Sequence, residues 1–116
     1  MKGVSMNFKK VADTSELPAG KMKKVTLDGK DVLLVNVDGA YYAIDNKCTH
    51  MGGSLVEGTL DGNVVTCPRH GSRFDVKTGK AVGKAKVAFI KIMPKDEKSY
   101  VVKVEGTDIM LETDGD

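Results

Sequence analysis

The 116-residue sequence contains no tryptophan and no glutamine, and its only aromatic residues are three phenylalanines and three tyrosines. Its uninterrupted apolar runs, such as Ala40–Ile44 and Val32–Val35, are only four or five residues long. A membrane-spanning helix needs about 20 apolar residues, so no span is expected. Residues Met1–Phe8 also lack the apolar core of about 7 to 15 residues that a secretory signal carries. We therefore expect a cytoplasmic protein.

Neither sign of charge dominates. The chain has 18 Lys and Arg residues against 16 Asp and Glu residues, for a formal net charge of +2. Charges of both signs are interspersed along the chain, and the absence of a basic block argues against nucleic-acid binding. With 41% apolar residues, the length suits one domain over residues 1–116 with one hydrophobic core.

The residues that are abundant predict antiparallel β-structure. The chain has 15 valines and 13 glycines, and Asp-Gly pairs separate short runs of alternating apolar residues. Such pairs are typical of tight hairpin turns, and strands at this spacing favour a sandwich or barrel. Thr14–Leu17 forms at most one helical turn, and residues 112–116 are expected to fray. The expected strands are Met22–Leu27, Asp31–Val37, Ala40–Ile44, Val64–Thr66, Phe89–Met93, Ser99–Glu105 and Ile109–Glu112.

All the cysteine and histidine residues fall into two short clusters. The first cluster is Cys48-Thr49-His50, and the second, 16 residues later, is Cys67-Pro68-Arg69-His70. Each cluster follows an expected strand. Each cluster offers one thiolate and one imidazole from one tight loop, as a four-coordinate metal or a two-iron site requires. The two loops therefore predict a metal site within residues 46–75.

The surrounding residues extend this pattern to a known family. Two segments resemble the cluster-binding segments of Rieske proteins. They are Cys48-Thr49-His50-Met51-Gly52-Gly53 and Cys67-Pro68-Arg69-His70-Gly71-Ser72-Arg73-Phe74-Asp75. Strand-like segments from about Phe8 to Glu112 also match the layout of a Rieske domain. The resemblance implies an all-β sandwich or barrel with a small subdomain of two loops that bind a [2Fe-2S] cluster. It further implies that Cys48 and Cys67 bind one iron, while His50 and His70 bind the other.

Two departures narrow the subclass. Respiratory Rieske proteins carry two further cysteines, joined in a disulfide, where this chain has Gly53 and Arg69. The segment Gly83–Ala88 also lacks the prolines that commonly cover the cluster. The chain is therefore similar to soluble Rieske-type ferredoxins.

The resemblance also assigns roles near the cluster. High-potential members have Ser and Tyr at the positions of Ser72 and Phe74, where each hydroxyl favours the reduced cluster. With only the serine present, we expect an intermediate reduction potential, although Ser72 could instead satisfy a turn. Arg69 and Met51 are candidates for docking a redox partner, since cationic and apolar side chains suit such a surface; burial is the commoner role of methionine.

These residues predict a one-electron carrier between a reductase and an oxygenase or other oxidoreductase. Catalytic Rieske oxygenases need a separate mononuclear iron, commonly bound by two His and a carboxylate, and no histidine remains for one. We therefore do not expect an enzyme. One alternative is a structural or interaction module in which the same Cys2His2 set binds zinc. Others are a Cys48–Cys67 disulfide and a Rieske subunit tightly bound in a larger enzyme.

Overall fold

The computed structural model describes residues 7–49, 53–69, 71–83, 85–87, 90–92 and 94–113, and only the backbone of 85–87 and 90–92. Within these ranges the chain forms thirteen strands and two short 3-10 turns, η1 (Thr14–Glu16) and η2 (Leu55–Glu57). All strand pairs in these ranges are antiparallel, as predicted. No helix in this part of the chain is long and apolar enough to cross a membrane.

The central sheet has the strand order β11-β4-β3-β2. Its hairpins turn at Asp28-Gly29 and Asp38-Gly39, and both residues of each pair have a positive φ, at 51° and 81° and at 53° and 93°. This is the geometry that two-residue hairpin turns require, so the turn prediction is confirmed. The strands of this sheet are β2 (Met22–Leu27), β3 (Lys30–Val37), β4 (Ala40–Asp45) and β11 (Ser99–Tyr100).

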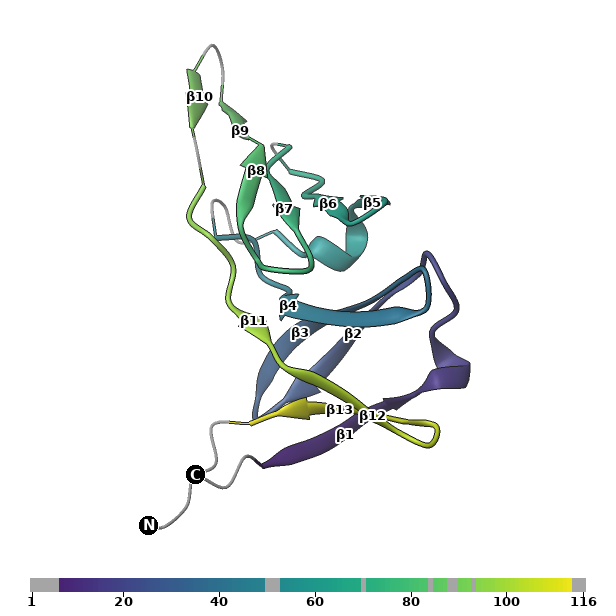
Figure 1. The fold of residues 1–116 in the computed structure, drawn as a ribbon. Coiled ribbons are helices and arrows are strands. Elements are labelled where there is room, and N and C mark those ends of the chain that lie inside the picture. The colour runs from purple at the N-terminus through teal and green to yellow at the C-terminus, as the bar shows by residue number, and fades with distance from the viewer. Residues whose placement is uncertain are drawn as a thin grey trace.

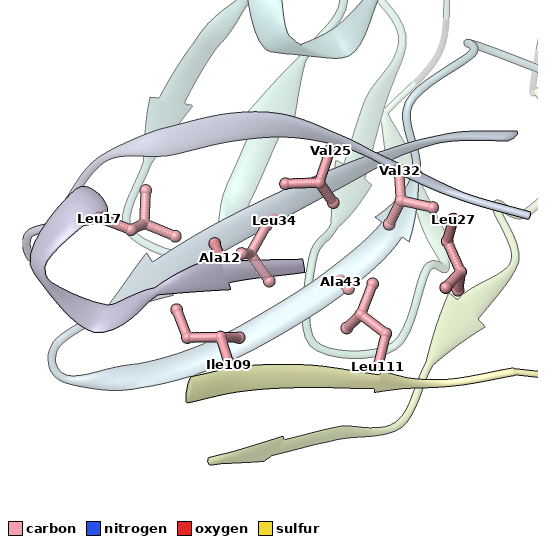
Figure 2. Close-up of a cluster of buried hydrophobic side chains, with 9 residues drawn as sticks. All are labelled: Ala12, Leu17, Val25, Leu27, Val32, Leu34, Ala43, Ile109 and Leu111. Atoms are coloured by element: carbon pink, nitrogen blue, oxygen red, sulfur yellow. The ribbon is translucent and has the colours of Figure 1, made fainter. Parts of the chain in front are cut away.

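A second sheet covers one face of the central sheet. It has the order β1-β13-β12, and the side chains between the two sheets form the first hydrophobic cluster (Figure 2). Val32 and Leu34 of β3 point into this cluster, opposite Ile109 and Leu111, and all four are fully buried. The bounds of the strands are β1 (Phe8–Asp13), β12 (Val102–Glu105) and β13 (Asp108–Glu112).

The other face of the central sheet carries a small subdomain. Its sheet has the order β5-β6-β7-β8, drawn above β4 in Figure 1. Leu33 and Val35 of β3 point toward it and join the second hydrophobic cluster, which includes Val65, Phe74 and Cys67. Because β3 is buried on both faces, its apolar run is continuous rather than alternating. The strands are β5 (Thr59–Asp61), β6 (Val64–Thr66), β7 (Arg73–Asp75) and β8 (Ala81–Gly83).

The C-terminal half contains strands that were not predicted, and one predicted strand is divided. The expected strand Phe89–Met93 corresponds to β10 (Ile90–Ile92), which pairs with the unpredicted β9 (Ala85–Val87); Phe89 and Met93 lie outside the described residues. The expected strand Ser99–Glu105 is wrong as a single element, since β11 pairs with β4 and β12 pairs with β13. The chain changes sheets at Val101, whose carbonyl accepts a hydrogen bond from Glu112 N–H at 3.0 Å.

The two ends of the described chain lie together in the second sheet (Figure 1). Phe8 pairs with Glu112, and Thr113 N–H donates to Asn7 C=O at 2.8 Å. Glu112, the first residue of the segment expected to fray, is thus part of β13, while residues 114–116 lie outside the described part. The 3-10 turn at Thr14–Glu16 agrees with the single helical turn expected there.

Candidate metal centre

Two loops with the same closure present the two cysteines. Cys48 N–H donates to Gly53 C=O at 2.7 Å, and Cys67 N–H donates to Ser72 C=O at 2.8 Å. Each loop therefore returns, five residues later, to the cysteine at its start. The first loop follows β4 of the central sheet, and the second follows β6 of the small subdomain. The predicted ligands His50 and His70 belong to these loops but lie outside the described residues.

The loops approach each other through Gly53. A Cβ added at this residue would lie 2.9 Å from Cys67 Sγ and 2.9 Å from Cγ and Cδ of Arg69. Real Cβ atoms essentially never make contacts this short, so a side chain here would force Cys67 Sγ and the stem of Arg69 to shift. Gly53 thus brings the loop that begins at Cys48 directly against the sulfur of the other loop.

Both cysteines are buried. Each side chain is 2% exposed, and both belong to the second hydrophobic cluster together with Leu55, Val65 and Phe74. They are not joined in a disulfide. Apolar side chains of this cluster thus surround both thiols.

The hydroxyl of Ser72 lies buried beside this pair. Ser72 is 1% exposed, and its Oγ has no hydrogen-bond partner within the described part of the protein. A buried hydroxyl without a partner costs free energy, so its presence indicates an acceptor that the described residues do not supply. Two buried thiols, a glycine cradle and a buried donor together suit a sulfur-containing metal cluster. The donor set therefore fits an iron–sulfur group.

The other residues singled out from the sequence divide between core and surface. Phe74 is fully buried and packs in the second hydrophobic cluster. Arg69 is exposed, with the stem of its side chain against Gly53. Met51, the second docking candidate, lies outside the described residues. Of these three, the structure thus places Phe74 under the loops and Arg69 on their outer surface.

Sequence reasoning missed two buried polar residues that hold the first loop. Asn46 is 4% exposed; its Nδ2 donates to Ser54 Oγ at 2.8 Å, and its Oδ1 accepts from Val56 N–H at 2.9 Å. These bonds close the base of the loop. An asparagine just before a ligand pair could have been recognised as a loop anchor, because its amide bonds nearby backbone.

The second missed residue is Glu97, which is 5% exposed. Its Oε2 accepts a hydrogen bond from Thr49 N–H at 2.9 Å. Burial raises the pKa of this carboxyl to about 7; the hydrogen bond from Thr49 opposes the rise, and the charge of Asp45 adds to it. Nothing in the local sequence distinguishes this residue, because it lies in the charged run Lys95–Lys98.

The chain matches known proteins over most of its length. Residues 7–94 match the model of the Rieske [2Fe-2S] domain. The ferredoxin component of the naphthalene 1,2-dioxygenase/salicylate 5-hydroxylase systems of Ralstonia sp is 37% identical over 108 residues, covering 93% of this chain and 97% of the relative.

Solved structures agree with this match. The ferredoxin of carbazole 1,9a-dioxygenase from Nocardioides aromaticivorans IC177 superposes with a TM-score of 0.76 at 31% identity, covering 90% of this chain and 95% of that one. A chain in the complex of reduced oxygenase and oxidized ferredoxin in carbazole 1,9a-dioxygenase gives 0.75 at 30% identity, covering 90% and 92%. By its motifs, fold and relatives, this chain belongs to the Rieske [2Fe-2S] domain family.

Proposed function

We propose that this chain is a one-electron carrier that uses one Rieske-type [2Fe-2S] cluster. The observation that carries the proposal is the pair of matched loops, in which both cysteines are buried and the buried Ser72 hydroxyl has no partner among the described residues. When bound, the cluster would accept and release a single electron. The ferredoxin relatives support a carrier rather than an oxygenase.

The proposed ligands are Cys48 and Cys67 for one iron and His50 and His70 for the other. This division is supported by the loops, each of which has one cysteine and one histidine. The oxidised core carries a charge of +2, so two thiolates and two neutral imidazoles bring it to zero. A neutral cluster accepts an electron more readily than one with four thiolates, and Rieske potentials accordingly lie at about -150 to +300 mV.

We propose that residues on the buried side of the cluster set its reduction potential and that residues on its exposed side bind the redox partner. From the buried side, we propose that the Ser72 hydroxyl donates a hydrogen bond to a cluster sulfur and so favours the reduced state; its burial without a partner among the described residues supports this role. Phe74 offers no second donor, which supports an intermediate potential. From the exposed side, we propose that Arg69 and Met51 form part of the surface that docks a redox partner, with the charge of Arg69 attracting acidic groups.

We propose a reductase and an oxygenase or other oxidoreductase as the partners. The dioxygenase-system ferredoxins to which the chain is similar support this choice, as does the similar chain from an oxygenase–ferredoxin complex. We also propose a cytoplasmic location. Thiol ligands must stay reduced until iron is inserted, and the cytoplasm provides that condition.

The test is the electron paramagnetic resonance spectrum of the dithionite-reduced protein, with iron and sulfide analysis. We expect two irons, two acid-labile sulfides and the signal of a Rieske cluster. Zinc without sulfide in protein matured under iron-replete conditions would instead support the zinc module. Co-purification of the untagged native protein with an oxygenase at fixed stoichiometry would support a bound subunit over a diffusing carrier.

A further inference from the structure

The segment Pro94–Lys98 runs between β10 and β11, and its backbone forms hydrogen bonds with three separate parts of the fold. Lys98 C=O accepts from Asp45 N–H of β4 at 2.9 Å. Lys95 C=O accepts from the Thr49 hydroxyl at 2.6 Å. Glu97 N–H donates to Gly79 C=O at 2.7 Å. The segment therefore ties the first ligand loop to β4 and to the turn that follows β7.

Gly79 holds the backbone of this segment through a close contact with Glu97. Its φ of +83° is one that residues with side chains rarely adopt. A Cβ added there would lie 2.2 Å from Glu97 C=O, so the contact allows no side chain. Gly79 N–H also bonds Asp75 C=O of β7 at 2.7 Å, and β7 begins immediately after Ser72. The backbone of Glu97 is thus held by the element that leads out of the second ligand loop.

The side chain of Glu97 reaches the first ligand loop. Its carboxylate accepts the Thr49 N–H at 2.9 Å, and Thr49 lies between Cys48 and His50 in the sequence. The residue is only 5% exposed. Burying a carboxylate costs free energy that burying an apolar side chain such as leucine would not. Charge-assisted hydrogen bonds to backbone amides are among the stronger ones in proteins. The pKa of about 7 leaves most of this carboxyl ionised at pH 8.

We propose that Glu97 is a positioning residue of the iron–sulfur site, which fixes the Cys48–His50 loop through Thr49 N–H and lowers the reduction potential through its negative charge. A fixed loop presents both ligands in one orientation. A buried negative charge near the loop opposes the addition of an electron, because water screens it poorly. This inference rests on the proposed ligand set.

Hydrogen–deuterium exchange of the iron-loaded protein, read by mass spectrometry on peptides that contain Thr49, tests the positioning role. In Glu97→Ala the Thr49 amide loses its acceptor and should exchange about tenfold faster, which corresponds to about 1.4 kcal/mol. Glu97→Gln keeps an acceptor oxygen and should restore most of the protection. Glu97→Asp keeps the charge on a shorter side chain, so the Thr49 amide should again lose its protection against exchange. This variant replaces Glu97→Ala if the alanine variant does not fold.

Asp96→Asn is the matched control, since it removes the same charge from the neighbouring residue. Asp96 is exposed, and its Oδ1 accepts from Ala81 N–H at 2.8 Å rather than from the ligand loop. We expect no change in Thr49 exchange for this variant. Unchanged exchange in Glu97→Ala and Glu97→Asp would overturn the positioning role.

The midpoint potential at pH 8 tests the electrostatic role. Glu97→Gln should shift the potential upward, by more than Asp96→Asn does, because the lost charge is buried. An equal or smaller shift than in the control would overturn this role. Failure of the proposed cluster would appear separately, as absence of the Rieske signal in the unmodified protein, whereas Thr49 exchange reports the hydrogen bond whichever metal is bound.

Discussion

Replacing Ser72 with alanine tests the connection between the buried hydroxyl and the cluster. Ser72 is 1% exposed and its Oγ has no partner in the described part of the protein. The substitution removes one oxygen at a residue whose backbone already closes the second loop through Cys67 N–H. Because that backbone bond does not depend on the side chain, the loop should keep its shape. Any change in the cluster's properties can then be attributed to the hydroxyl.

The size of the effect follows from the strength of one buried hydrogen bond. If the hydroxyl donates to sulfur, the bond strengthens as the cluster gains an electron, and we assign the difference about 1 to 2 kcal/mol. For a one-electron couple, a tenfold change in the equilibrium constant is about 59 mV, or about 1.4 kcal/mol. Ser72→Ala should therefore lower the reduction potential by roughly 40 to 90 mV.

Protein-film voltammetry at fixed pH measures this shift. Ser54→Ala provides the control, because Ser54 also flanks the first loop but its Oγ already accepts from Asn46 Nδ2 at 2.8 Å. That variant should lose stability with a smaller change in potential. If Ser72→Ala and the unmodified protein had the same potential, the hydroxyl would not bond the cluster and the reasoning would be wrong.

Three further substitutions test other parts of the site. Gly53→Ala would place a Cβ 2.9 Å from Cys67 Sγ, so iron per chain should fall; full iron content with an unchanged spectrum would contradict this. Phe74→Tyr should raise the potential by adding a second donor, and an unchanged potential at full iron content would mean that the ring edge faces away from the cluster. Glu97 has a folded pKa of about 7 against an ordinary 4.5, so the folded state holds a proton that the unfolded state releases between these values. The Glu97 carboxyl therefore contributes fully to the free energy of unfolding below pH 4.5, and this contribution declines toward pH 7 by at most about 3 kcal/mol. The unfolding midpoint of Glu97→Gln relative to the unmodified protein should therefore rise from pH 5 to pH 8, and a constant difference would contradict the shifted pKa.

The parts of the fold that could be predicted from the sequence are those with local causes. The Asp28-Gly29 and Asp38-Gly39 turns specify hairpins through their own backbone preferences, and both adopt the required positive φ. The run Val32–Val35 correctly predicted a strand, but only the structure shows that it is buried on both faces. The change of sheets at Val101 could not be predicted, because both flanking segments have strand-like composition and their partners lie elsewhere in the chain.

The same distinction separates the predicted from the unpredicted parts of the site. Cys48 and Cys67 stand out because they are the only cysteines in this chain and each has a histidine two or three residues later. Glu97 is hidden in a run of charged residues that composition alone assigns to the surface. Its burial depends on Thr49, 48 residues earlier, and on the positive φ of Gly79. Neither contact leaves a periodic signal, because each joins single residues rather than faces of strands. The proposed ligands of the cluster are therefore visible in the sequence, whereas Glu97, which we propose orients two of them, is visible only when the chain is folded.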